Sequence, residues 1–265
     1  MMKNKLLHRK KWLLIALVMM GSGVFAQEQL YLYAGLGIGA IDNYDIGTTP
    51  YHIKGLAMAY DLGASFACDR YLFQIDARYN RSTLTTMSGT NQALDVKASV
   101  LYRCIDSKDD RFHYYAGGSL QGYGEVKDVP ALMNASTCTS LFVNLCGVNI
   151  VSYDFAFNEA KTHHWLTAYG KLTLPIVGAV NRPDFAYTID GQGMGYFEWF
   201  FANQETFAKF FPGCTTDLGL CLNLRNGNRI GLNYRWDYLS TGRRGIWRYD
   251  NAYHTISLDF LFKIN

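Results

Sequence analysis

Histidine and aspartate side chains near the end of the chain could activate water for hydrolysis. His254 is close in sequence to Asp237 and Asp250, and a carboxylate that orients a histidine helps it act as a general base. The alternation of the sequence, however, places His254 on the outer face of a strand or at its rim, and Asp237 on the inner face. Ser257 follows His254 by an odd spacing, so these two residues point to opposite faces of an extended strand. We therefore expect no catalytic site here.

A second candidate for chemistry is the adjacent pair His163 and His164. No Ser or Cys is in register with this pair, and no third metal ligand accompanies it, whereas protein zinc sites take three or four protein ligands. The sequence also contains no Gly-x-Ser-x-Gly and no phosphate-binding loop. We expect no cofactor and no bound metal. A formal net charge of only +3 gives no reason to expect nucleic-acid binding.

Charged residues of both signs recur on one face of the predicted strands. We predict that this face lines a narrow lumen, in which opposite charges on neighbouring strands, such as Asp76 and Arg78 beside Asp95 and Lys97, pair and fill the interior as a structural plug. A selective pore is the alternative, although such pores usually carry a lining of a single sign. The predicted inward charges are Asp61, Asp76, Arg78, Asp95, Lys97, Arg103, Lys171, Asp217, Arg235, Asp237, Asp259 and Lys263.

Cysteines of the chain could form disulfides, because we expect it to be exported to an oxidising compartment. Cys138, Cys146 and Cys214 fall in or beside the two longest predicted loops, and a bridge among them would hold these loops together. Free buried thiols are the alternative, and the sequence leaves the pairing open. The cysteines after the predicted leader are Cys68, Cys104, Cys138, Cys146, Cys214 and Cys221.

The predicted loop 178–213 is unusually aromatic for a segment that faces water. It can form a lid over the mouth of a barrel, an interfacial helix in the outer leaflet, or a contact site for a partner protein or ligand. As candidate binding residues we select its aromatic side chains Tyr196, Phe197, Trp199, Phe200, Phe207 and Phe211.

The elements that must position these groups are long strands with strict alternation. In 71–80, for example, Tyr71, Phe73 and Ile75 alternate with Gln74 and Asp76. Hydrophobic residues make up 49% of the chain and aromatic residues 15%, which suits a barrel that turns its apolar side chains to lipid. We predict an all-β fold, a closed antiparallel transmembrane β-barrel of about ten strands, within about eight to twelve. The strands are centred on 30–40, 55–66, 71–80, 94–103, 111–124, 149–159, 163–177, 214–224, 230–238 and 255–263.

Short and long connections alternate between the predicted strands. The short ones are 68–70, 106–110, 158–162 and the Asn-Gly turn at 226–227, and the long ones are 42–53, 83–92, 125–148, 178–213 and 240–252. Outer-membrane barrels have short periplasmic turns and longer extracellular loops. This alternation places both chain ends in the periplasm.

The first residues have the form of a secretory signal peptide. Basic residues precede the apolar run 12–20, and Val24-Phe25-Ala26 is typical of a cleavage site. We therefore divide the chain into a signal peptide, 1–26, and a barrel, 27–265, whose largest extracellular loop is 178–213.

The alternating strands, the leader and the closing segment 254–265 resemble the outer-membrane β-barrel proteins of Gram-negative bacteria, and most of all those of the Bacteroidota. The resemblance implies a place in the cell outer membrane, in contact with the lipid bilayer and lipopolysaccharide. We expect a non-enzymatic accessory or scaffold subunit of an outer-membrane complex, or a surface-binding protein, that acts through its extracellular loops. Its partner would be an outer-membrane protein or lipoprotein. The alternatives are a porin-like channel for small solutes and, least favoured, an omptin-like or lipid A deacylase-like hydrolase.

Overall fold

The computed structural model describes residues 29–106, 111–135, 137–156, 164–182, 212–241 and 248–264; the predicted signal peptide, 1–26, lies outside them. A short 3-10 helix, η1 (Pro130–Ala135), accompanies the strands. Within these ranges no helix has the length and apolar character needed to cross a membrane. The strands are β1 (Gln29–Asp45), β2 (Thr49–Cys68), β3 (Tyr71–Leu84), β4 (Gly89–Asp106), β5 (Phe112–Asp128), β6 (Thr137–Ala156), β7 (His164–Asn181), β8 (Gly213–Asn223), β9 (Arg229–Ser240) and β10 (Tyr249–Ile264).

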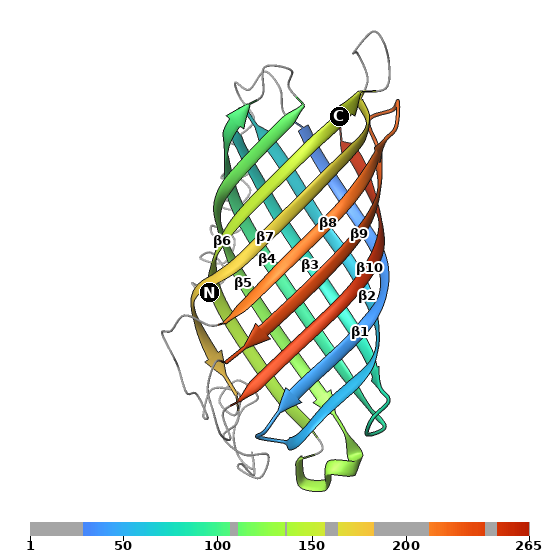
Figure 1. Cartoon of the computed structure of the whole chain (residues 1–265), viewed down its shortest axis with the longest axis vertical. Coiled ribbons are helices and arrows are strands. Elements are labelled where there is room, and N and C mark those ends of the chain that lie inside the picture. The colour runs from blue at the N-terminus through green and yellow to red at the C-terminus, as the bar shows by residue number, and fades with distance from the viewer. Residues whose placement is uncertain are drawn as a thin grey trace, which may run out of the picture.

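The strands form one closed antiparallel barrel (Figure 1). Each strand pairs with the next along the chain, and β1 closes the sheet by pairing with β10 from Leu30↔Ile264 to Asp45↔Tyr249. Closure leaves no sheet edge with unpaired backbone groups, which is the condition for strands to span lipid. The predicted all-β barrel of ten strands is confirmed.

The outer surface of the barrel is apolar because alternate residues of each strand point outward. Leu36, Ile38 and Leu56 are 65%, 71% and 69% exposed, whereas Ala57 and Ala59, on the opposite face of β2, are 2% and 1% exposed. Exposing many large apolar side chains to water is unfavourable by about 25 cal/mol per Å². A lipid environment removes this cost, so the fold is that of a transmembrane barrel.

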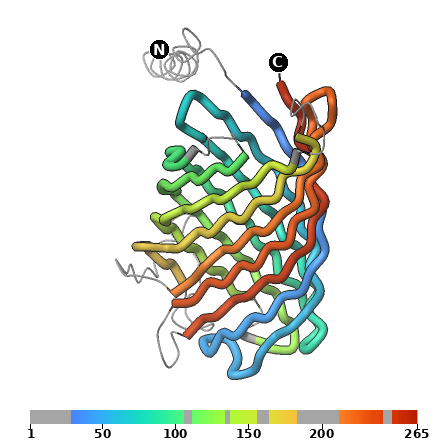
Figure 2. The backbone as a smooth tube through the Cα atoms, turned by 45° about the horizontal axis from the view of Figure 1, so that its top comes forward, coloured from blue at the N-terminus to red at the C-terminus, as the bar shows by residue number. Residues whose placement is uncertain are grey.

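The two ends of the barrel differ. At the terminus end, β1 begins and β10 ends beside each other, and the β2–β3 turn lies at the same rim (Figure 2). At the far end lie the β1–β2 hairpin and η1 (Figure 1). We use the names terminus end and far end for these two rims throughout.

Three of the predicted long loops are wrong, because the strands continue into them at the far end. β1 and β2 are separated only by 46–48, β3 and β4 by 85–88, and β5 and β6 by 129–136, where loops 42–53, 83–92 and 125–148 were expected. The reason is packing inside the barrel. Ile41, Asn43 and Asp45 continue the inward face of β1 and are at most 2% exposed, so the ladder extends beyond the length that a membrane span needs. The long connection at this end joins β7 to β8.

The main apolar core lies inside the barrel at the far end. It combines side chains from most of the strands, with Tyr249, Phe142, Ile53 and Val129 at 0% exposure. These inward aromatic and branched side chains are buried only if the strands around them continue, which explains why the strands are long at the far end. The buried members are Ile41, Ile53, Ala57, Leu84, Ala93, Tyr123, Val129, Phe142, Val180, Leu239, Tyr249 and Tyr253.

Candidate functional site

The aromatic residues predicted to bind a partner lie outside the described residues. The structure reaches Arg182 after β7 and resumes at Pro212 before β8, so it describes only the two strands that anchor this segment. The functional site that can be built from described side chains is the lumen. The sequence candidates outside the description are Tyr196, Phe197, Trp199, Phe200, Phe207 and Phe211.

Aromatic rings fill the lumen at the far end. The rings of Phe142 and Tyr249 have centroids 5.4 Å apart, and those of Tyr123 and Phe142 have centroids 6.0 Å apart. The guanidinium of Arg182 covers the opposite side of this cluster, 4.5 Å from the centroid of the Tyr249 ring. These contacts join β5, β6 and β10 across the interior, so we call this cluster, with the polar groups around it, the far-end seal.

Buried polar groups complete the far-end seal. Asp45 is fully buried and forms ion pairs with Arg182 at 2.6 Å and with Lys127 at 3.0 Å. Glu125 accepts hydrogen bonds from the hydroxyls of Tyr123 at 2.7 Å and Tyr249 at 2.5 Å. Lys127, Glu125 and Asp45 fall in segments that we expected to be loops. The continued alternation beyond Ile41 is the sequence signal that could have located them.

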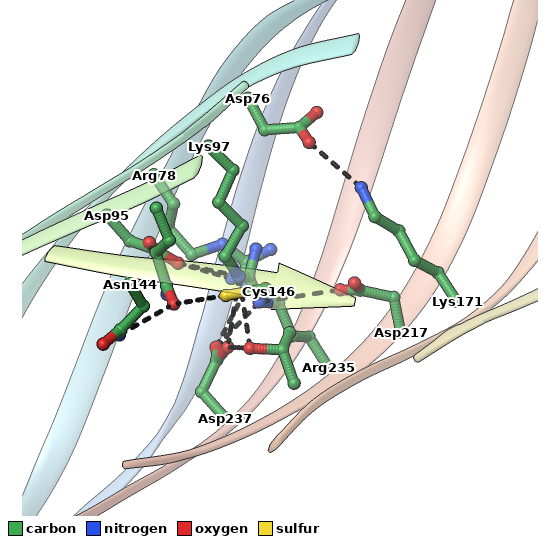
Figure 3. A network of polar contacts seen from close by, with 12 residues as sticks. Asp76, Arg78, Asp95, Lys97, Asn144, Cys146, Lys171, Asp217, Arg235 and Asp237 are labelled. Atoms are coloured by element: carbon green, nitrogen blue, oxygen red, sulfur yellow. Dashed lines mark hydrogen bonds and ion pairs between the residues drawn. The ribbon is translucent and has the colours of Figure 1, made fainter. Parts of the chain in front are cut away.

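A layer of ion pairs crosses the middle of the lumen (Figure 3), between the far-end seal and the terminus end. Arg78 binds Asp61 through two hydrogen bonds of 2.5 and 2.8 Å. Arg235 lies 2.7 Å from Asp95 and 2.7 Å from Asp237. The charged residues of this layer are buried or half-buried and of both signs, which confirms their predicted inward orientation.

The pairing within this layer differs from the expected one. The register aligns Asp76 with Lys97 and Arg78 with Asp95, the neighbours that we expected to pair. Instead Lys171 reaches from β7 to Asp76 on β3, with 3.0 Å between Nζ and Oδ2 (Figure 3). A long side chain in a narrow barrel can contact strands that are not its neighbours, and the sequence does not reveal which strands face each other.

Between the ion-pair layer and the terminus end, the lumen opens into a cavity of about 900 Å³. Its outer wall includes Gln29, Arg70 and Arg229, which lie at the terminus end, and its floor includes Asp95 and Lys97. The cavity is large enough for a small ligand. Our expectation of a lumen with room for little beyond side chains was wrong in this half of the barrel. We call this space the terminus-end cavity.

Between the cavity and the seal the free space is small. A void of about 30 Å³ lies beside Gln121, Thr215 and Asp237, which is enough for about two water molecules. The described lumen therefore has an open half at the terminus end and a filled half at the far end.

The histidine pattern agrees with the predicted faces. His254 is exposed on the exterior, where its ring stacks on Trp236 with centroids 6.2 Å apart. Asp237 points into the lumen and lies 2.7 Å from Arg235, so it does not orient His254. His164 lies in β7 and His163 falls outside the described residues. Among the side chains that are described, no group of three or more His, Cys, Asp or Glu could hold a metal ion.

One histidine contact in the cavity escaped the sequence analysis. His113 on β5 lies 3.5 Å from Asp154 on β6, at the wall of the terminus-end cavity. Neither residue belongs to a recognisable motif, and only the strand register brings the two together. Asp154 also accepts a hydrogen bond from the hydroxyl of Thr167, so the histidine belongs to a polar cluster on the cavity wall.

All six described cysteines are free thiols. The predicted loop staple was placed wrongly, because Cys138 and Cys146 lie within β6, and Cys214 lies within β8. Cys138 and Cys146 are 5% and 1% exposed, and the thiol of Cys146 lies 3.6 Å from the amide oxygen of Gln121. These two thiols are part of the lumen packing.

No family model and no curated protein matches the chain. Among solved structures, the β domain of the Bordetella autotransporter BrkA is similar with a TM-score of 0.40 at 10% identity, covering 89% of this chain and 99% of that one. Neisserial surface protein A gives 0.37 at 11% identity, with 86% and 95% covered. The toluene transporter TodX of P. putida gives 0.33 at 7% identity, with 91% of each chain covered. Likenesses of this size carry no inference about what this barrel binds or transports.

Proposed function

We propose that this protein is a non-enzymatic barrel of the cell outer membrane that conducts no solute and acts as a scaffold or surface-binding protein. The observation that carries the proposal is the far-end seal. A solute passing through would have to separate Asp45 from Arg182 and displace the rings of Phe142 and Tyr249. Breaking one buried ion pair alone costs about 3–5 kcal/mol.

The proposed orientation places the terminus end in the periplasm and the far end outside the cell. The leader-like residues 1–26 and the apolar exterior support insertion from the periplasmic side. In this orientation lipid and lipopolysaccharide surround the barrel wall. The seal then faces the exterior of the cell.

The contact surface that we propose is the connection between β7 and β8. Its aromatic residues Tyr196, Phe197, Trp199, Phe200, Phe207 and Phe211 would dock an outer-membrane protein or lipoprotein. Because the lumen beneath is filled, recognition by this barrel would occur on its outer rim. This partner role rests on the aromatic composition of the segment.

Single-channel recording in planar bilayers tests the closed lumen. We expect no stepwise current from the wild-type protein. A variant without the seal, carrying Asp45→Ser, Arg182→Ser and Tyr249→Ser, serves as the positive control and should give discrete steps once its folding is verified by gel mobility. Steps from the wild type that are as large as those of the variant would contradict the proposal. They would favour the narrow channel, for which the terminus-end cavity would be a vestibule.

Chemical cross-linking in intact cells, followed by mild detergent purification, tests the partner role. We expect a discrete adduct that disappears when 185–211 is deleted and persists when 242–247 is deleted. An adduct that survives both deletions, or none in the wild type, would argue against docking through this segment. The two deletions remove different connections of the same rim. If only the first abolishes the adduct, the loss reflects residues 185–211 and not a general disturbance of the far-end structure.

A further inference from the structure

Among the described residues, the wall of the terminus-end cavity carries charges of both signs without an ion pair, apart from the exposed turn residue Asp69. Inside the cavity, Asp61, Asp76, Asp95, Asp154 and Asp217 each lie within 4.0 Å of a basic side chain. Asp259 and Arg229 line the same cavity and take part in no ion pair with any described residue.

Asp259 lies on the inward face of β10. Its Oδ1 is buried without a hydrogen-bond partner, and its Oδ2 accepts a hydrogen bond from the amide of Asn233. The nearby carboxylate of Asp61 is already committed to Arg78. Gly35 faces Asp259 from β1, and a Cβ at that position would collide with the carboxylate. The Oδ1 atom of Asp259 is therefore buried against Gly35 of the barrel wall. The side chain as a whole is half-buried and lines the cavity, so its negative charge faces a ligand there through Oδ2.

Arg229 is the first residue of β9 and lies nearer the mouth of the cavity. Its guanidinium stacks on the ring of Tyr31, 4.6 Å from the centroid. Stacking uses the flat face of the guanidinium and leaves its N–H groups in the plane for a carboxylate. Tyr31 is 8% exposed, so the ring holds this cation in place beside the opening.

The strand register sets how far apart the two residues lie along the strand direction. Leu261 of β10 pairs with Arg229, and Asp259 precedes Leu261 by two residues toward the ion-pair layer. The two positions are therefore separated by about 7 Å along the strand direction. An extended chain also spans about 7 Å over two residues. Leu261, at the level of Arg229, lines the cavity and offers an apolar surface beside the path between the two positions.

We propose that the terminus-end cavity binds a zwitterionic ligand of about dipeptide length. Its ammonium group lies against Asp259, its carboxylate against the free edge of the Arg229 guanidinium, and its central part against Leu261. Such a ligand supplies both missing partners at once, whereas a ligand with one charge leaves the other group unpaired. This inference goes beyond the scaffold role, because it concerns the inner cavity and does not depend on the far-end connections.

Isothermal titration of the full barrel in detergent micelles tests the proposal with three probes. They are Ala-Ala, N-acetyl-Ala-Ala without the ammonium group, and Ala-Ala-amide without the carboxylate. We expect Ala-Ala to bind with one site per barrel and each blocked peptide to bind at least tenfold more weakly. Absence of heat from Ala-Ala up to millimolar concentrations, or equal affinity for all three peptides, would overturn the proposal.

Substitutions assign the two ends of the ligand. Asp259→Asn should remove the preference for a free ammonium group, and Arg229→Gln should remove the preference for a free carboxylate. Asp42→Asn, on the exterior near the far end, and Arg225→Gln, in the β8–β9 turn, are matched controls that should bind like the wild type. Equal losses in the controls would also overturn the assignment. If Asp259→Asn fails to fold, the three-peptide series on the wild type still decides.

Current recording on the same preparation separates this inference from the proposed function. Ala-Ala binding in a barrel that conducts would overturn the scaffold proposal alone. A silent barrel that binds no zwitterion would overturn only the cavity proposal.

Discussion

Asp45 and Arg182 meet inside the far end of the barrel, with 2.6 Å between Oδ1 and Nη2, although 137 positions separate them in the chain. The first is the last residue of β1, and the second directly follows β7. Their contact crosses the lumen and holds two distant parts of the wall together. Asp45, although it is the last residue of its strand, therefore stabilises the interior of the barrel.

Removing this carboxylate should destabilise the barrel strongly. Asp45→Ala leaves the buried Arg182 and Lys127 without their shared partner, and an uncompensated buried charge costs about 3–5 kcal/mol. Urea unfolding in lipid vesicles, followed by tryptophan fluorescence, measures the loss. Asp42→Ala is the control, because the Asp42 side chain is 39% exposed beside His52 and such pairs contribute about 0–1 kcal/mol. Similar losses in both variants would contradict a stabilising seal.

Phe142 should be the most sensitive apolar position of the far-end seal. It is fully buried between Tyr123 and Tyr249, and truncation of a buried Phe to Ala costs about 3–5 kcal/mol. The same unfolding assay should show a smaller loss for Phe142→Leu, which refills much of the volume. If the two variants unfold at the same urea concentration, the ring is not packed as described.

A charge on the lipid-facing wall should hinder insertion. Leu36 is 65% exposed on β1, and Leu36→Arg should cost up to about 2–4 kcal/mol in a bilayer, depending on depth. Tyr51→Arg, close to the β1–β2 hairpin and 64% exposed, should cost much less because it lies near the far-end rim. Folding yields into vesicles compare the two. A Leu36→Arg variant that folds as well as the wild type would show that this face is not in lipid.

Thiol labelling should report the orientation of the barrel. Cys104 is exposed near the terminus end of β4, whereas Cys138 and Cys146 are buried. In a Cys214→Ser background, which removes the half-buried thiol at the far end, a membrane-impermeant maleimide should leave intact cells unlabelled and react with Cys104 after the outer membrane is permeabilised. Cys104→Ser should abolish this signal. Labelling of Cys104 in intact cells would place the terminus end outside.

The sequence predicts the wall of this barrel better than its contents. Alternation at 71–80 and 94–103 identifies β3 and β4 because lipid on one side and the lumen on the other impose a period of two residues. The same pattern places Asp61, Arg78 and Arg235 inside correctly. At the far end the predicted strands are too short. The inward face beyond Ile41 carries the polar residues Asn43 and Asp45, which look like loop residues although they are buried.

Contacts across the lumen could not be predicted from local pattern. The pairing of Lys171 with Asp76 depends on barrel closure, which sets the strands that face each other. The cavity likewise depends on which strands bring small residues such as Ala67 to the interior, and on Gly35, which leaves room for Asp259. Period and spacing describe single strands, whereas these features arise from several strands at once.

The filled far half and the open terminus half give the barrel the form of a blind cup. A molecule that enters the cup must leave through the same mouth, so its occupancy follows the concentration in one compartment only. If the proposed seal holds, such a barrel comes to equilibrium with that compartment and sustains no flux. In the described barrel, a change at the far-end rim reaches the cup through the packed side chains of the far-end seal.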